Sequence, residues 1–319
     1  MPSIARAAMD QVVEVLLSRA VSGKNCTKDT CSVKDSVYGY YPSKPVNIIL
    51  VAIFAISMFA HFYQGIRSKS WTFLVALGIG TFGEAVGYVG RILLRSDPFS
   101  KAYLGIQLVC LTVAPAFIAG GIYLTLKHLI IVYGSQFSRI TPKWYTRIFI
   151  SCDIASILIQ SAGAVMASKG TASSVSAGNN TMMVGLVFQV VTLAVFGVMA
   201  VDVFFRIRGH RGEFTQSAEN LRASKRFKGL MIAIVIAYIT IEIRCLYRIA
   251  EMAGGWKNPI MQDQVAFIIL DGVMCAIAVV ALNIFHPGFL FEQSYATLKA
   301  EGMQYSEEMA TTTFSNTKK

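Results

Sequence analysis

The stretch Val265–Phe285, VAFIILDGVMCAIAVVALNIF, decides the fold class, because Asp271 is its single charged side chain. A transmembrane helix needs about 20 predominantly apolar residues to cross a hydrocarbon core of about 30 Å. This stretch has that length, and it lacks the alternation of apolar and polar residues that is typical of a barrel strand. We therefore predict a membrane-spanning helix here.

Six further stretches have the same length and apolar character, so we predict an all-α bundle of seven transmembrane helices. The composition agrees, because 54% of the 319 residues are hydrophobic and 15% are charged, against about 25% charged in soluble domains. This composition excludes a soluble enzyme and a disordered chain. The seven predicted spans are Val46–Ile66, Trp71–Leu94, Ala102–Val132, Ile148–Ser168, Met182–Phe205, Gly229–Ala250 and Val265–Phe285.

Lysine and arginine are concentrated on one side of the predicted bundle. The basic segments are 67–70, 133–147, 206–228 and 286–319. The loops on the opposite side hold only Arg95, Lys101, Lys169 and Lys257. Because cytoplasmic loops are enriched in Lys and Arg, we place the N-terminus outside and the C-terminus in the cytosol. The net charge of +11 then reflects topology, and we expect no nucleic-acid partner.

Three domains follow from this topology. We predict an outer tail over 1–45 with a short amphipathic helix at 4–21, a seven-helix domain over 46–286, and a largely disordered cytosolic tail over 287–319. The outer side contains two glycosylation sequons, which begin at Asn25 and Asn179. Cys26 and Cys31 also lie there, where the oxidising environment would allow a disulfide between them. The sequons and the cysteines both agree with the orientation.

Motifs of soluble enzymes are nearly absent from the sequence. It contains no lysine-containing phosphate loop, no His-Glu-x-x-His and no metal-spaced set of Cys and His. We therefore expect no cofactor, no metal and no enzymatic activity. The segment 78–83 fits the Gly-x-Gly-x-x-Gly dinucleotide pattern, but it lies inside a predicted span with no strand before it. Close packing of helices on small residues is the better interpretation.

Ionisable residues inside the spans carry the functional information. Inserting one costs several kcal/mol, about 2.5–3.5 on insertion scales, so such residues pair with one another or line polar cavities. On the sixth span Arg244, Arg248 and Glu251 share one helix face, while Glu242 points nearly the opposite way. The candidate residues of a translocation pathway are Glu84, Arg91, Asp153, Gln160, Gln189, Glu242, Arg244, Arg248 and Asp271.

A purely structural interpretation of these charges stays open, since ion pairs can also lock helices together. Glu84, Arg244 and Asp271 are the hardest to explain as ordinary helix-end charges. By contrast, we expect Arg95, Glu251 and Asp202, near the ends of spans, to reach the membrane interface. On the third span we expect Tyr123 to be an interface anchor.

Six ordered motifs resemble the fungal lipid-translocating exporter family, whose seven-helix members are linked with resistance to aminocholesterol. The resemblance covers roughly residues 40–290, and one departure is visible, because Gln264 and Ile268 replace the acidic residue and the tyrosine that family members often have. The motifs are Gly83-Glu84-Ala85-Val86-Gly87-Tyr88-Val89-Gly90-Arg91, Ala114-Pro115-Ala116 with Ala119-Gly120-Gly121-Ile122-Tyr123, Asp153 with Gln160, Gly185 with Gln189, Ile243-Arg244-Cys245-Leu246-Tyr247-Arg248-Ile249-Ala250-Glu251, and Asp271 with His286-Pro287-Gly288.

The resemblance implies a plasma-membrane or endomembrane protein that moves amphipathic lipids. Sphingoid long-chain bases, aminosterols and, in one branch, porphyrin or haem are the associated substrates. Since no nucleotide motif is present, we expect transport without an ATPase. Two alternatives remain open: a membrane sensor or receptor with a cytosolic partner at loop 206–228, and an intramembrane enzyme, for which the sequence offers no constellation of catalytic residues.

Overall fold

The computed structural model describes residues 28, 30–133, 138–167, 172–209, 223–254 and 258–290. Within these ranges all regular structure is helical, and seven helices are long and apolar enough to cross a membrane. The all-α prediction with seven spans is therefore confirmed. The helix predicted at 4–21 and nearly all of the predicted cytosolic tail lie outside the described residues.

The spans follow one another along the chain with three to fifteen residues between them. The last span is continuous but changes its helical type twice, from α9 through the π-helical turn η3 to α10. A short 3₁₀ turn, η1 (Val33–Asp35), precedes the first span. The spans are α2 (Lys44–Arg67), α3 (Trp71–Ser96), α4 (Lys101–Tyr133), α5 (Pro142–Ala167), α6 (Ala172–Gly209), α8 (Lys225–Ala253) and α9 (Gln264–Phe267) with η3 (Ile268–Val273) and α10 (Met274–Ile284).

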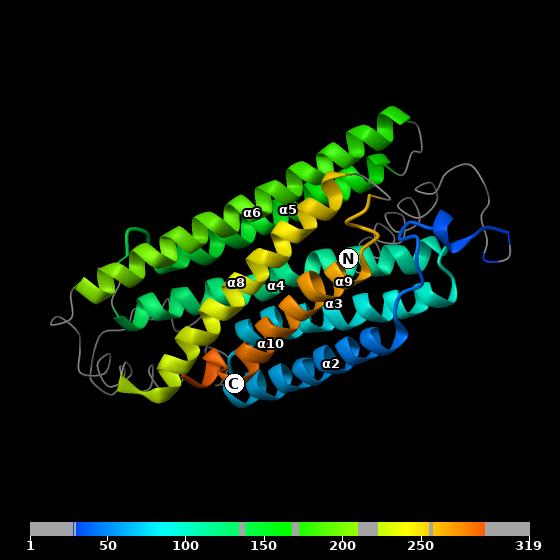
Figure 1. The fold of residues 1–319 in the computed structure, drawn as a ribbon. Coiled ribbons are helices and arrows are strands. Elements are labelled where there is room, and N and C mark those ends of the chain that lie inside the picture. The colour runs from blue at the N-terminus through cyan, green and yellow to red at the C-terminus, as the bar shows by residue number, and fades with distance from the viewer. Residues whose placement is uncertain are drawn as a thin grey trace, which may run out of the picture.

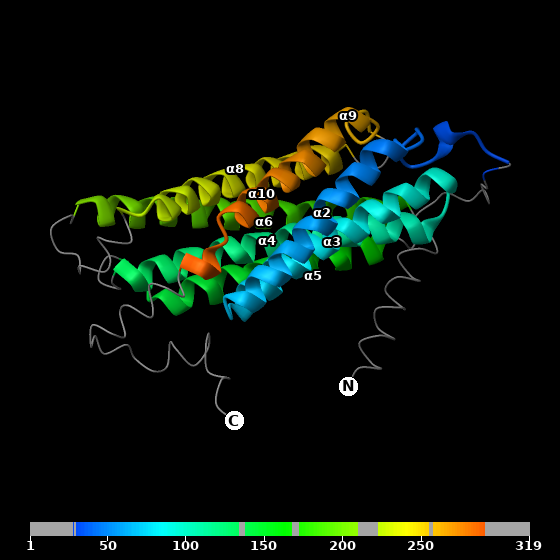
Figure 2. The same ribbon diagram turned by 90° about the horizontal axis from the view of Figure 1, so that it is seen from below.

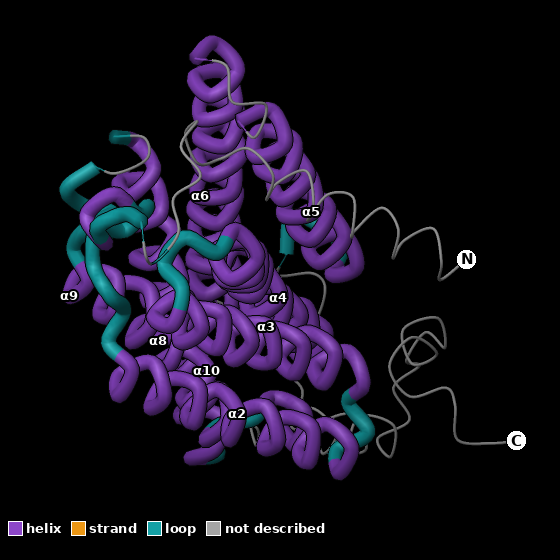
Figure 3. Tube along the Cα trace, turned by 90° about the vertical axis from the view of Figure 1, so that its right-hand side faces the viewer, coloured by secondary structure: helices purple, strands orange, loops and turns teal. Residues whose placement is uncertain are grey.

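The helix α4 lies in the middle of the bundle. Seen from the end, α5 and α6 lie on one side of it, and α2, α3 and α10 lie on the other (Figure 3). The closest helix pairs are α3 with α4, α5 with α6, and α2 with α3 (Figure 1). Consequently Tyr123 of α4 is fully buried, and its expected role as an interface anchor is wrong. From Ala114 to Tyr133 no residue of α4 is exposed, as expected of a helix that is apolar on all faces, which explains the difference.

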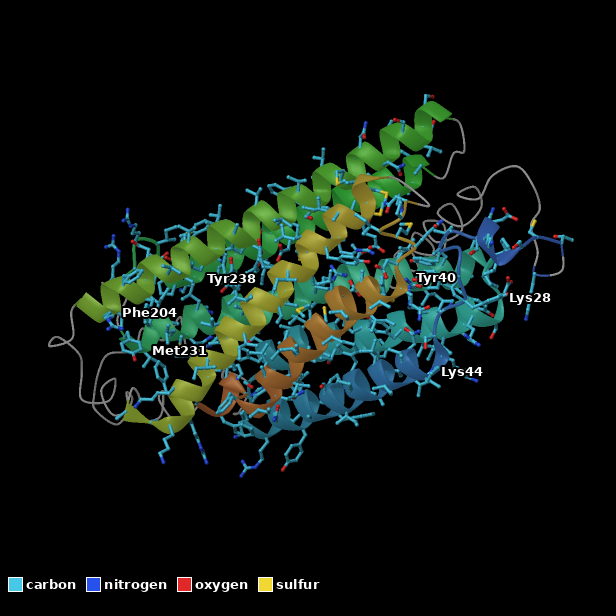
Figure 4. All side chains as sticks on the ribbon, in the orientation of Figure 1. Lys28, Tyr40, Lys44, Phe204, Met231 and Tyr238 are labelled. Atoms are coloured by element: carbon cyan, nitrogen blue, oxygen red, sulfur yellow. The ribbon has the colours of Figure 1, made fainter. Side chains whose placement is uncertain are left out.

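The two ends of the elongated bundle can be named by labelled residues. Tyr40 and Lys44 lie at one end, here called the Tyr40 end, and Phe204 and Met231 lie toward the other, here called the Met231 end (Figure 4). The view from below shows the same elongated shape (Figure 2). In the predicted orientation the Tyr40 end faces outward.

Small residues allow α3 to approach α4 closely. A Cβ atom added at Gly80 would lie 2.8 Å from Cγ1 of Ile118, and one added at Gly90 would lie 3.0 Å from the backbone nitrogen of Gln107. Both glycines thus face α4 across a gap that no larger residue fits. The glycines of segment 78–83 lie within helix α3, so the helix-packing interpretation is confirmed.

The crossing of α5 and α6 depends on Gly163 in the same way. A Cβ atom there would lie 2.6 Å from the backbone nitrogen of Met182 and 2.7 Å from the carbonyl oxygen of Gly178. Because backbone atoms cannot rotate away, Gly163→Ala should destabilise the protein by about 1–3 kcal/mol, the usual effect of overpacking. Thermal unfolding of the purified protein in detergent would measure it.

Gly120→Ala is the matched control for that substitution, because a Cβ atom at Gly120 meets nothing within 4 Å. Both changes add one methyl group to a glycine inside a membrane helix. Equal melting temperatures for the two variants would contradict the predicted close crossing of α5 and α6.

Candidate functional site

A buried group of charged residues joins α3, α8 and the last span. We call Glu84, Tyr88, Arg244 and Asp271 the central charge cluster, and none of them is more than 1% exposed. The Nε group of Arg244 lies 2.9 Å from Oδ1 of Asp271. The Tyr88 hydroxyl donates a hydrogen bond of 3.0 Å to Oδ2 of the same carboxylate. Both carboxylate oxygens of Asp271 are therefore satisfied, as a buried charge requires.

The local helix geometry brings Asp271 to this position. Asp271 lies in the π-helical turn η3, Ile268–Val273, and single π turns inside α-helices are frequent at functional sites. The next residue, Gly272, allows Tyr88 to approach the last span closely, because a Cβ atom there would lie 2.8 Å from the Tyr88 hydroxyl oxygen. Arg244 is held from a further side, since its guanidinium also donates to the carbonyl oxygen of Leu111.

Glu84 is the unpaired member of the central charge cluster. It is fully buried, and it makes no ion pair with a described residue. The thiol of Cys275 is its hydrogen-bonding neighbour. The carboxyl groups of Glu84 and Asp271 thus both lie near Arg244, and Asp271 is the one that forms the ion pair with it. Glu84 must therefore carry a proton, or a cation from outside the chain must balance it.

A second buried ion pair lies in the last turns of α8, at the Tyr40 end of the bundle. Arg248 and Glu251 form an ion pair, and Asn258 donates to the backbone carbonyl of Glu251. Glu251 is fully buried, so the expectation that it reaches the interface is wrong. The reason is the segment after α8, where Asn258 and the buried Met261 cover the helix end.

Arg91 lies apart from both pairs, among aromatic rings. Its guanidinium carbon lies 3.8 Å from the ring centroid of Phe267 and 5.0 Å from that of Tyr38, and its Nη2 group donates a bond of 2.6 Å to the Tyr40 hydroxyl. Burial raises the pKa of Tyr40, so this tyrosine stays neutral. The buried positive charge of Arg91 is therefore stabilised by cation–π attraction to these rings instead of by an ion pair with a carboxylate.

The remaining candidates lie on the other side of α4. Asp153 of α5 is 5% exposed, and its Oδ2 atom makes no hydrogen bond with a described residue. Glu242 of α8 is half-buried, and its Oε2 atom is likewise without a partner. Gln160 donates a bond of 3.2 Å to Oε1 of Gln189, which joins α5 to α6. In the described ranges neither Asp153 nor Glu242 makes an ion pair.

A family model described as RTA1 like protein matches residues 77–294. This range contains all nine candidate residues. The chain belongs to the RTA1-like family. The resemblance inferred from the sequence motifs is therefore confirmed.

Curated relatives of this RTA1-like protein come from Saccharomyces cerevisiae. The sphingoid long-chain base transporter RSB1 is 33% identical over 290 residues, which cover 81% of this chain and 75% of the relative. Protoporphyrin uptake protein 1 is 28% identical, with 64% of this chain and 65% of the relative covered. Protein RTM1 is 25% identical, with 77% of each chain covered. No solved structure is significantly similar to this chain.

The RTA1-like fold thus separates the predicted pathway residues into groups. Glu84, Arg244 and Asp271 come together as expected, and Arg248 pairs with Glu251 on the same face of α8. Sequence reasoning missed the aromatic surroundings of Arg91. The signal available was Tyr38-Gly39-Tyr40 directly before the first span. Asp202, with its side chain 36% exposed, pairs with Arg139 and Arg206, in agreement with its expected place near the interface.

The structure bears only partly on the predicted disulfide and on the two predicted glycosylation sites of the outer side. Cys31 is disulfide-bonded, while Cys26, its predicted partner, and Asn25 lie outside the described residues. Asn179 lies within α6, because this helix begins earlier than the predicted span. Both glycosylation sites stay predictions. Among the described residues no group of three or more His, Cys, Asp and Glu side chains could hold a metal.

Proposed function

We propose that this protein translocates amphipathic lipids, sphingoid long-chain bases first among them, across the bilayer without hydrolysing nucleotide. The main support is a set of three acids within the spans, the buried Glu84 and Asp153 and the half-buried Glu242, none of which makes an ion pair with a described residue. A buried acid in a membrane span is expected to serve an ion or substrate pathway. The identity of 33% with a sphingoid long-chain base transporter supports the substrate class.

The charge of these acids favours a cationic substrate. A sphingoid base carries a protonated amine on a hydrocarbon chain, so a buried carboxylate attracts its head group while the chain stays in lipid. A porphyrin with free carboxylates would be repelled by the same acids, although one relative is named a protoporphyrin uptake protein. We propose the plasma membrane as the location, and a cytosolic partner at loop 206–228 for the alternative role as a sensor.

Vesicles that contain only the purified protein test this function. We expect protein-dependent movement of a fluorescent sphingoid base between leaflets, and slower movement of fluorescent phosphatidylcholine. A pH gradient across the vesicle membrane would reveal coupling to protons. If the folded protein moves neither lipid, with or without the gradient, the translocator proposal is wrong and the sensor role replaces it. Protein-free vesicles are the control for spontaneous lipid movement.

A further inference from the structure

An apolar groove runs between α3, α4 and α5 on the surface of the bundle. Its volume is about 520 Å³, within the range of about 300–1,000 Å³ that is usual for ligand pockets. Trp71, Val75 and Ile154 line it, and each of them is about half exposed. Because such apolar side chains face lipid in a membrane, the groove is open to the bilayer from the side. Ile157 borders both this groove and a smaller hollow of about 120 Å³ toward the Tyr40 end.

Polar residues interrupt the apolar lining of this groove. Asp153, Thr72 and Thr146 are among its lining residues, and the hydroxyl oxygens of the two threonines are buried without a hydrogen-bond partner among the described residues. The carboxyl group of Asp153 has the buried Tyr123 hydroxyl as its hydrogen-bonding neighbour, and no cation lies beside it among the described residues. In lipid no water satisfies such groups. Their arrangement indicates a ligand that brings donors into the groove.

The charges along the groove are ordered by depth. Lys127 also lines it, one helical turn beyond Tyr123 on α4 and therefore nearer the Met231 end, with Lys143 and Arg147 close enough to interact with it electrostatically. A lysine in this place extends its charge toward the interface. Asp153 lies about 10 Å further along α5 than Thr146, at 1.5 Å per residue. The Met231 end of the groove is thus basic and would repel a cation, whereas the deep part is acidic, so a cationic head group would enter from the side that faces lipid.

We propose that the groove between α3, α4 and α5 binds a single-chain cationic amphiphile, with its ammonium group at the carboxyl group of Asp153 and its hydrocarbon chain along the seam of α4 and α5 toward Ile157. This inference rests on the proposed function and assigns its substrate site. An ammonium group offers three donors and a positive charge, so it can bind the Asp153 carboxylate, to which no described residue brings a cation.

Photo-crosslinking of the whole protein in phosphatidylcholine nanodiscs tests the site. The probe is a long-chain primary amine with a photoreactive group in its chain, competed by octadecylamine or by octadecanoic acid. We expect saturable labelling of α4 and α5 around Ile154 and Ile157, which the amine removes and the acid does not. Asp153→Asn should lower saturable labelling by at least about tenfold, since it removes the charge that pairs with the ammonium group.

Asp202→Asn is the matched control, because the same change is made to an exposed acid outside the groove. It should label like the wild type. Ile154→Trp provides a second variant in case Asp153→Asn does not fold, since it fills the groove from the lipid side without changing a charge. We expect it to block labelling as well. Labelling of Asp153→Asn and Ile154→Trp at the wild-type level, or competition by the acid alone, would overturn the proposed site.

The site and the proposed function fail in different ways. If Asp153 governs labelling but the wild type moves no lipid in vesicles, the binding site stands and translocation is refuted, which leaves a lipid sensor. If the wild type moves a sphingoid base and Asp153→Asn binds and moves it equally well, translocation stands and the substrate path lies elsewhere in the bundle.

Discussion

Arg244→Met should leave little of the protein folded. The substitution removes the ion-pair partner of Asp271 and the cation that acts most strongly on Glu84, so two acids remain in the core without an ion-pair partner among the described residues. Breaking a buried ion pair in this way costs about 3–5 kcal/mol, a large part of the 5–15 kcal/mol by which a protein is stable. The yield of monodisperse protein after detergent extraction, and the melting temperature of what remains, would measure the loss.

Arg95→Met is the matched control for this prediction. Arg95 is an exposed arginine on α3 that donates one hydrogen bond of 3.1 Å to the carbonyl oxygen of Pro42. Its replacement should change yield and melting temperature little. The double variant of Arg244→Met with Asp271→Asn should recover part of the stability, because it also removes the charge of Asp271. Equal stability of Arg244→Met and Arg95→Met would show that the central ion pair is not needed for folding.

The sequence predicts the spans well because hydropathy acts locally. Each span is recognisable from its own residues, as Val265–Phe285 shows, and the seven helices are confirmed. Helix ends are harder, because a helix continues beyond the apolar core of the membrane. The helix α6 therefore begins at Ala172 instead of Met182, and Asn179 lies within the helix.

The candidate charges were predictable as a set, but not all of their partners were. Helix periodicity placed Arg244, Arg248 and Glu251 on one face, and all three are buried. The burial of Glu251 depends on the segment after α8, whose path no local pattern reveals. The π-helical turn that contains Asp271 is equally hidden from the sequence, and so are its partners Tyr88 and Arg244, which come from two other helices.

Glu84→Gln should leave the protein folded and lower gradient-driven lipid movement by at least about tenfold, if this buried acid serves the transport pathway. The side chain keeps its size, no ion pair with a described residue is lost, and the amide oxygen can still accept a hydrogen bond from the Cys275 thiol. What disappears is the second acid beside Arg244, the group that a proton or the amine of a substrate can occupy. Movement of a fluorescent sphingoid base in vesicles, with a pH step across the membrane, would measure the effect.

Stability and transport should change in opposite directions in this variant. Arg244 and Asp271 already satisfy each other, so Glu84 adds a buried group without a partner, and its neutral replacement should fold at least as well as the wild type. Glu84→Asp keeps the acid and should retain a response to the pH step, while Asp202→Asn should behave like the wild type. A gradient response that survives in Glu84→Gln would assign the coupling to Asp153 or Glu242 instead. Loss of the response with a raised melting temperature would show that the protein keeps an unfavourable buried acid because transport requires it.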